Sequence, residues 1–251
     1  MKAQCLLGMT ALLVVSALGI SGRTPAVYGA SPDKKICEKV MKHGHRVLSC
    51  HTVKPTTIYA TNWQSGTTGW TSGGAGQWKV ANGALQFDAK GDGTFVAPYR
   101  NNQSNYFVEA SIQQLRINPP NPSKPLQDAF GILFRAPGAF DPSRDSDPPG
   151  NALGAGVSRL TYDGNDAGSE ISVVTVVDYF GTYDGSKKFK PGNTIHLYRL
   201  EVRANTMWIY FDGHLAVVER NIHLFLNATR VGLFSIGDQI RVTSFRVGPL
   251  T

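Results

Sequence analysis

Apolar and polar residues alternate in short runs along most of the chain after residue 55, and turn-forming residues separate these runs. A strand points successive side chains to opposite sides, so a strand with one buried side shows this two-residue period. Glycine, asparagine, aspartate and proline between the runs indicate turns. The pattern predicts strands at residues 77–80, 84–88, 93–97, 106–117, 129–135, 157–162, 170–177, 194–203, 206–211, 214–219, 230–235 and 239–247.

Two of the turns between these predicted strands have a well-specified sequence. They are Asn82-Gly83 and Asp212-Gly213, and both pairs tolerate the positive φ angles that a type I′ turn requires. Each pair therefore predicts a tight hairpin. Because no 3.6-residue period persists over three turns, the whole pattern favours an all-β protein, a two-sheet antiparallel sandwich or jelly roll.

Two proline-rich stretches, residues 118–126 and 137–155, interrupt the alternation and are predicted to be long loops. Both lie next to the predicted strand 129–135. Long loops on a rigid sandwich often carry binding surfaces. The alternative is a surface excursion without function, and the sequence favours neither.

The first 30 residues have the layout of a secretory signal peptide. Lys2 is followed by an apolar run over residues 5–20 and by a break at residues 21–25. An uncleaved membrane anchor is the alternative, but the run is shorter than the roughly 20 residues that span a bilayer. We therefore predict a signal peptide at 1–30, a secreted or cell-surface protein, and no stable membrane insertion after cleavage.

Charge and length then set the organisation of the exported part. Signal removal takes two positive charges from the formal net charge of +7. The other basic residues are scattered, and without a basic stripe interleaved with aromatics no nucleic-acid partner is predicted. The sequence predicts an N-terminal appendage at 31–55, where Ile36, Val40 and Met41 have the spacing of about one helical turn, and one domain at 56–251.

The appendage contains the only two cysteines of the exported part, Cys37 and Cys50, because Cys5 lies in the signal segment. In an oxidising compartment they are expected to form a disulfide, which is worth about 3 kcal/mol for a loop near 15 residues. A zinc site with His43 and His45 is the alternative. Its spacing fits no standard zinc finger, so the disulfide is preferred.

Several motifs follow one another between residues 70 and 247. They are WKVANGAL at 78–85, FGILFR at 130–135, HLYRLEV at 196–202, WIYFDG at 208–213, VGLF at 231–234 and VTSFRV at 242–247. Their order resembles bacterial domains of the concanavalin A-like lectin/glucanase superfamily. The resemblance implies a jelly roll of two curved antiparallel sheets, whose concave sheet forms a groove that accepts a glycan in many relatives.

The stretch 196–213 is also similar to part of family 16 glycoside hydrolases. In those enzymes one strand carries a nucleophilic glutamate, a helper aspartate and an acid/base glutamate. The only candidate strand here has Glu170, but Ser172 stands in place of the aspartate and Val174 and Thr175 in place of the second glutamate. One carboxylate cannot fill both roles, so no catalytic residue is predicted. A glycan-active hydrolase or lyase with a non-standard site stays an alternative.

The residues instead favour a secreted, lectin-like domain that binds a polysaccharide or glycan without cleaving it. Sugars are bound by flat aromatic side chains with a few placed polar groups. The predicted ligand-binding residues are Arg135, Glu170, His196, Trp208 and Tyr210, with Tyr162 and Tyr183 near the rim. For His196 a hydrogen-bonded core position is the alternative, and Trp63, Trp70 and Trp78 are expected in the core. A structural or adhesion domain with a filled or apolar groove is a third hypothesis.

The other carboxylates predict neither a metal nor a cofactor. Relatives in the superfamily often carry structural calcium, and the candidates are Asp88 with Asp92, Asp163 with Asp166, and the loop 141–147. None has EF-hand spacing, and Asp-Gly turns explain most of them. Glu109, Glu201 and Glu219 each lie in a predicted strand and are expected on a solvated outer side.

Overall fold

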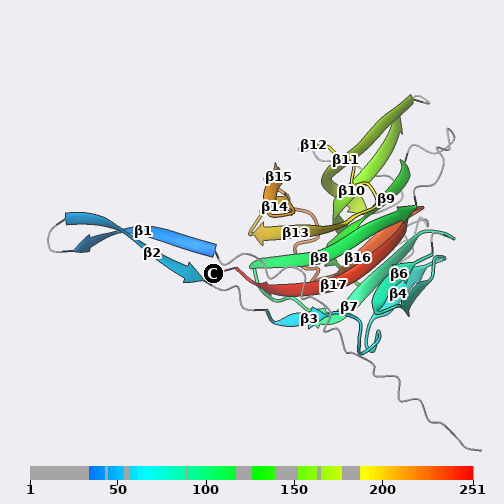
Figure 1. Cartoon of the computed structure of the whole chain (residues 1–251), viewed down its shortest axis with the longest axis horizontal. Helices are drawn as coiled ribbons and strands as arrows, with labels where there is room; N and C mark the ends of the chain where they lie inside the picture. Colours follow the sequence, from blue (N-terminus) through cyan, green and yellow to red (C-terminus); the bar gives the residue numbers. More distant parts are fainter. Residues whose placement is uncertain are drawn as a thin grey trace, which may run out of the picture. The chain divides into compact units, whose positions relative to one another are not determined.

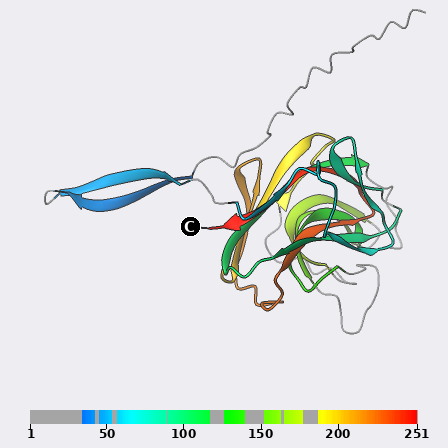
Figure 2. The same cartoon turned by 90° about the horizontal axis from the view of Figure 1, so that it is seen from below.

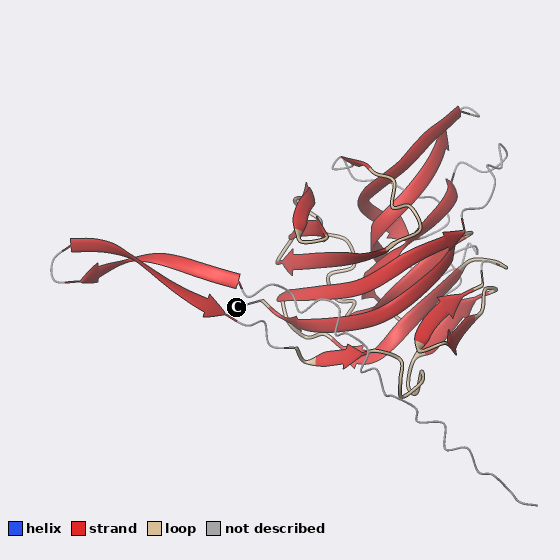
Figure 3. Cartoon of the chain, in the orientation of Figure 1, coloured by secondary structure: helices blue, strands red, loops and turns tan. Residues whose placement is uncertain are grey.

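The computed structural model describes residues 34–42, 45–53, 57–88, 90–116, 126–139, 152–162, 165–176 and 187–250. These residues form strands joined by loops and turns (Figure 3), and none of them forms a helix long and apolar enough to cross a membrane. The predicted signal peptide and most of both predicted long loops lie outside the described residues. The strands after residue 57 belong to two sheets, one seven-stranded and one eight-stranded.

Each sheet combines strands from distant parts of the sequence. The seven-stranded sheet contains β4 (Thr71–Gly74), β7 (Gly93–Arg100), β9 (Leu126–Ala136), β10 (Ala152–Tyr162), β11 (Asn165–Val176), β12 (Lys187–Lys188) and β16 (Arg230–Ile236). The eight-stranded sheet contains β3 (Tyr59–Thr61), β5 (Trp78–Ala81), β6 (Ala84–Phe87), β8 (Asn105–Arg116), β13 (Ile195–Arg203), β14 (Thr206–Phe211), β15 (His214–Glu219) and β17 (Gln239–Pro249).

The chain passes repeatedly from one sheet to the other. β7, β9 and β16 belong to the seven-stranded sheet, whereas β8 and β17 belong to the eight-stranded one. β8 pairs antiparallel with β13 and β17, and β9 pairs antiparallel with β10 and β16 (Figure 1). Two antiparallel sheets with crossings of this kind form a jelly roll, which confirms the predicted fold class.

One hydrophobic core takes side chains from both sheets. Phe130 and Leu153 belong to the seven-stranded sheet, Val108 and Leu200 to the eight-stranded sheet, and all four are buried. The sheets therefore pack face to face, and in Figure 2 their strands curve around this interior. Each large apolar side chain that is fully buried stabilises the fold by about 1.5–3 kcal/mol.

Of the three tryptophans expected in the core, Trp63 lies in it, and Trp70 and Trp78 pack against it. Trp63 is 1% exposed. Trp70 and Trp78 are partly buried, and their rings stack on Phe95 with centroid distances of 4.8 and 5.3 Å.

The predicted strands all correspond to observed strands, with ends that differ by a few residues. The largest errors are at the starts of β10 and β11, which begin at Ala152 and Asn165 and not at the predicted 157 and 170. The start of β10 lies inside the stretch 137–155 that we predict to be a loop. Residues 153–155 pair with β9, so the glycine and alanine content of this part is that of a close strand pair and not of a loop. β3, β4 and β12 are missing from the prediction because they have only two to four residues and because no Asn-Gly turn marks their ends, as one does for the equally short β5 and β6.

Both predicted hairpin turns are confirmed. Asn82 and Gly83 have φ angles of 52° and 67°, and Asp212 and Gly213 have φ angles of 46° and 80°. These left-handed conformations at both central positions are those of a type I′ turn. The two turns connect β5 to β6 and β14 to β15.

The cysteine-containing segment is a two-stranded antiparallel sheet, seen as the blue ribbon in Figure 2. It consists of β1 (Lys34–Lys42) and β2 (His45–Val53). The helical turn that we inferred from the spacing of Ile36, Val40 and Met41 is therefore wrong, because these residues belong to a strand. In a strand, residues 36 and 40 share one side, so their spacing fits β1 as well as it fits a helix.

The register of β1 and β2 places Cys37 and Cys50 directly opposite each other. Residues opposite each other in an antiparallel pair have Cα atoms about 4.5–5.5 Å apart, which is within the range that a disulfide spans. We predict that the chain carries this bond in an oxidising compartment. Intact-mass measurement with and without reduction, each followed by thiol alkylation, should show two alkylated cysteines only after reduction. Two free thiols, or stoichiometric zinc, in the unreduced protein would contradict the prediction.

Candidate functional site

The outer side of the eight-stranded sheet carries charged and aromatic residues on four neighbouring strands. Buried Leu200 and Val202 alternate with the outer residues of β13, and buried Met207 and Ile209 do so on β14. The side chains between them therefore point away from the core. We call this surface the charged face and define it by Phe107, Glu109, Arg199, Glu201, Arg203, Trp208, Tyr210 and Arg246.

The strand register places most of these residues in two rows across the sheet. The first row consists of Arg246, Glu109, Arg199 and Tyr210, on β17, β8, β13 and β14 in turn. The second row consists of Phe107, Glu201 and Trp208, on β8, β13 and β14. Directly opposite residues of adjacent strands have their Cβ atoms about 4.5–5.5 Å apart, so these side chains contact one another.

A network of ion pairs joins the charged residues of both rows. Glu109 accepts hydrogen bonds from Nη1 of Arg199, at 3.3 Å, and from Nε of Arg246. Arg199 also donates from Nε and Nη2 to Oε1 of Glu201, at 3.1 and 3.0 Å, and Nη2 of Arg203 lies 3.5 Å from Oε2 of Glu201. The side chain of Glu109 is 3% exposed, so its charge depends on these guanidinium groups and not on water.

Two arginines of the network also lie over aromatic rings. The guanidinium carbon of Arg199 is 4.0 Å from the ring centroid of Phe107, and that of Arg203 is 5.7 Å from the ring centroid of Trp208. Burial raises the pKa of the Tyr210 phenol above its ordinary value, so the hydroxyl stays neutral. Two of the predicted ligand-binding residues, Trp208 and Tyr210, thus lie together on one side of β14 and are half-buried.

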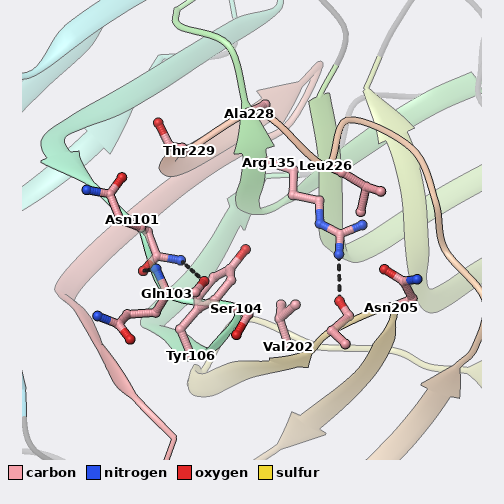
Figure 4. A pocket seen from close by; sticks show the side chains of 12 residues that line it. Asn101, Gln103, Ser104, Tyr106, Arg135, Val202, Asn205, Leu226, Ala228 and Thr229 are labelled. Carbon is pink, nitrogen blue, oxygen red and sulfur yellow. Dashed lines mark hydrogen bonds between the residues drawn. The ribbon is translucent and has the colours of Figure 1, made fainter.

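A cavity of about 320 Å³, which we call the end pocket, opens where three connections between strands meet (Figure 4). These are the β7–β8 connection, the β13–β14 turn and the connection from β15 to β16. Its lining residues are Asn101, Asn102, Gln103, Ser104, Tyr106, Arg135, Val202, Ala204, Asn205, Leu226, Ala228 and Thr229. The end pocket therefore contains one predicted ligand-binding residue, Arg135.

Arg135 links two of the connections that surround the end pocket. Its Nη2 donates to the carbonyl of Ala204 at 2.7 Å, and its Nη1 donates to the carbonyls of Ile222 and Leu224 at 2.9 and 3.2 Å. Its φ angle of 49° is left-handed and coincides with a register irregularity between β9 and β16, so the strand bulges here and Arg135 points to the pocket. The guanidinium of Arg135 thus donates hydrogen bonds to the protein's own backbone.

His196 lies away from the charged face and is held on both ring nitrogens. Nδ1 lies 2.8 Å from Oδ2 of Asp212, and Nε2 lies 2.7 Å from Oγ1 of Thr194 and 2.8 Å from the carbonyl of Pro191. Its ring contacts Phe211 at a centroid distance of 4.5 Å. The alternative expects such a hydrogen-bonded histidine. Through its bond to Asp212, His196 connects the start of β13 to the β14–β15 turn.

Glu170 belongs to the other sheet and is not brought together with Trp208. It lies on β11 opposite Ser158 and Lys188. Ser172, at the position where family 16 enzymes have an aspartate, is fully buried, and its hydroxyl lies 3.4 Å from that of Ser158. Glu170 is half-buried, and its neighbour Ile171 packs in the core, so Glu170 points away from that core.

A separate apolar cluster lies on the seven-stranded sheet. Its members alternate with core residues of the same strands, as Val96 does with Phe95 and Ala97, so they belong to the outer side. The cluster consists of Val96, Ala129, Leu133, Ala136, Ala152, Phe234 and Ile236. This part of the outer side is therefore apolar and buried, as the structural or adhesion hypothesis expects of a groove.

The two tyrosines predicted near the rim and the candidate calcium ligands complete the predicted residues. The side chain of Tyr162, at the end of β10, and all of Tyr183 lie outside the described residues. Within the described part of the chain, no group of three histidine, cysteine, aspartate or glutamate residues is arranged to hold a metal ion. Asp88 accepts hydrogen bonds from the backbone nitrogens of Gln77 and Lys90, which is the turn-forming role that we expect for such aspartates.

The sandwich, its strand order and its crossings define a concanavalin A-like jelly roll. A solved structure from Bacillus subtilis, described as a protein of unknown function with a galectin-like fold, superposes with a TM-score of 0.55 at 15% identity and covers 77% of this chain and 96% of that chain. The metal-free carbohydrate recognition domain of Emp46p superposes with a TM-score of 0.53 at 12% identity and covers 78% and 98%. No family model and no curated protein sequence matches the chain. These similarities establish the fold.

Proposed function

We propose that the chain is an exported carbohydrate-binding domain that binds a glycan at the charged face without cleaving it. One observation carries the proposal: Trp208 and Tyr210 lie side by side on β14, next to the ion-paired residues Arg199, Glu201 and Arg203 of β13. The fold similarity to a named carbohydrate recognition domain supports it.

The chemistry of the charged face suits a sugar in two ways. A sugar ring has apolar C–H faces, which pack on flat aromatic rings, and hydroxyl groups, which need planar donors and acceptors. Trp208 and Tyr210 supply the rings, while Arg203 and Glu201 on the neighbouring strand β13 supply a donor and an acceptor. Because the network already fixes Glu201 and Arg199, little side-chain freedom is lost when a ligand binds.

The same network argues against a glycosidase. A retaining or inverting mechanism needs one carboxylic acid that donates a proton to the leaving group. Glu109 and Glu201 both accept hydrogen bonds from guanidinium groups, so their geometry is that of acceptors. Glu170, the residue that resembles a nucleophile, lies on the other sheet, with Ser158 and Lys188 as its strand partners.

The proposal is tested with a glycan array and four variants of the full exported chain. Trp208→Ala should abolish the signal, Trp208→Phe should retain most of it because a ring remains, and Arg203→Ala should weaken it about ten-fold through a lost charged hydrogen bond. Lys79→Ala is the matched control, because Lys79 is an exposed cation on β5, at the far edge of the same sheet. A silent array with folded protein, or binding indifferent to Trp208, would contradict the proposal.

A reducing-end assay on every glycan that binds tests the non-catalytic part separately. We expect no release of reducing sugar. Release that disappears in Glu170→Gln would establish a hydrolase and make Glu170 a catalytic residue.

A further inference from the structure

We propose that the end pocket is a second binding site, which takes a neutral polyhydroxylated ligand the size of one sugar ring. The pocket lies between connections at the end of the sandwich, whereas the charged face lies on the outer side of the eight-stranded sheet. The proposal therefore does not depend on glycan binding at the charged face.

The lining of the pocket offers paired donors and acceptors but little charge. Carboxamides come from Asn101, Asn102, Gln103 and Asn205, and Ser104 adds a hydroxyl. Each carboxamide has both an N–H donor and a carbonyl acceptor, and each hydroxyl of a polyol also donates and accepts. Among the described residues that line the pocket there is no aspartate, glutamate or lysine, so a cation would find no counter-charge and an anion only that of Arg135.

Both ionisable groups of the lining, Arg135 and Tyr106, are engaged within the protein. The guanidinium of Arg135 is directed to the three backbone carbonyls of Ala204, Ile222 and Leu224. Tyr106 is 5% exposed, and its burial raises the pKa of its phenol far above the ordinary value, so it does not ionise in the physiological range. The positive charge of Arg135 disfavours a cation, and an anion would compete with the backbone carbonyls for its donors. A neutral ligand meets neither difficulty.

The walls of the pocket are held in place before any ligand arrives. Asn101 is 6% exposed, and its Oδ1 and Nδ2 bond to the backbone nitrogen and carbonyl of Gln103, at 3.2 and 3.3 Å. Its backbone nitrogen donates to the carbonyl of Thr229 at 2.7 Å, which ties the β7–β8 connection to the segment before β16. Together with the contacts of Arg135 on the opposite wall, these bonds preorganise the site.

Size sets the ligand class. A cavity of about 320 Å³ is at the small end of the roughly 300–1,000 Å³ that is usual for small-molecule pockets. Leu226 and Ala228 give one wall apolar character, against which the C–H face of a ring can pack. The exposed side chains of Asn102, Gln103 and Ser104 line the opposite connection and are free to turn toward hydroxyl groups.

The test is an NMR titration of the isotope-labelled exported chain. The probes are the methyl α-glycosides of glucose, galactose and mannose and myo-inositol, with glucuronate and glucosamine as charged counterparts. We expect saturable shifts of the Asn102, Gln103 and Asn205 side-chain amides with at least one neutral probe, at a Kd of about 1 mM, and weaker binding of the charged counterparts. Saturation by none of the neutral probes would overturn the proposal.

Four variants locate the binding. Gln103→Ala should weaken it about five-fold, and Ala228→Leu, which fills the pocket from its apolar wall, should abolish it. Asn227→Ala is the matched control. This exposed carboxamide belongs to the same β15–β16 connection as Ala228 but does not line the end pocket. Binding should also survive Trp208→Ala. Binding that is lost with Trp208 but indifferent to Gln103 and Ala228 would place the ligand on the charged face and overturn the second site.

Discussion

Replacing Gly156 with alanine is expected to lower the free energy of unfolding by about 3 kcal/mol or more. A Cβ atom on Gly156 would overlap the carbonyl oxygen of Phe130 and would lie 2.7 Å from the Cα of Gly131 on β9. Both neighbours are backbone atoms of a central strand pair, so they cannot move aside as a flexible side chain would. The melting temperature should fall by roughly 6–12 °C or more, at about 2–4 °C per kcal/mol for a domain of this size.

Gly131 shows why the whole strand pair depends on glycine. Gly131 and Gly156 are register partners, and a Cβ on Gly131 would overlap the carbonyl oxygen of Ala155. Gly131→Ala should therefore be about as harmful as Gly156→Ala. Gly138→Ala is the control, because a Cβ there meets no atom within 4 Å and Gly138 has no left-handed φ. Urea denaturation of the three variants measures the differences. Equal stability of Gly156→Ala and Gly138→Ala would mean that β9 and β10 do not approach as described.

The second large effect is expected at Glu109, where substitution by alanine should destabilise the protein by about 3 kcal/mol. This carboxylate is nearly fully buried and accepts hydrogen bonds from Arg199 and Arg246. Its removal takes the carboxylate acceptor from Nη1 of Arg199 and from Nε of Arg246 in a partly dehydrated position. Glu109→Gln should cost less, because its amide oxygen still accepts one hydrogen bond.

A double-mutant cycle separates the ion pair from other effects of the substitution. Arg246→Met removes the partner but keeps an apolar stem, and Glu109→Ala with Arg246→Met should cost less than the sum of the two single variants. The coupling is read from urea denaturation at two salt concentrations, and it should change little with salt because the pair is shielded from solvent. Additive effects, or a coupling that disappears in high salt, would contradict the assigned burial.

The fold was predictable because its main signals are local. Alternation along β13 identifies Leu200 as a core residue. Asp212-Gly213 specifies the turn between β14 and β15 through backbone geometry alone. The misreading of residues 36–41 has the same origin. A spacing of four residues fits both a helix and a strand, and only the pairing with β2 decides between them.

The candidate site was predictable only in part, because it depends on strand register. Trp208 and Tyr210 follow from alternation within one strand. Glu109 and Arg246 are 137 residues apart in sequence, and nothing local indicates that β8 and β17 pair with these two residues opposite each other. The role of Arg135 was equally hidden, because its acceptors are backbone carbonyls, which every residue possesses.

The hydrogen bonds of Arg135 to three backbone carbonyls allow the side chains around the end pocket to change without moving its walls. Because Arg135 holds Ala204, Ile222 and Leu224 by main-chain oxygens, the position of these connections does not depend on which side chains they carry. The neighbouring side chains of half-buried Asn205 and exposed Leu226 are thus open to substitution while the backbone beneath them stays fixed. A library randomised at such positions, with Arg135 unchanged, is therefore expected to yield variants that bind other ligands at small cost in stability.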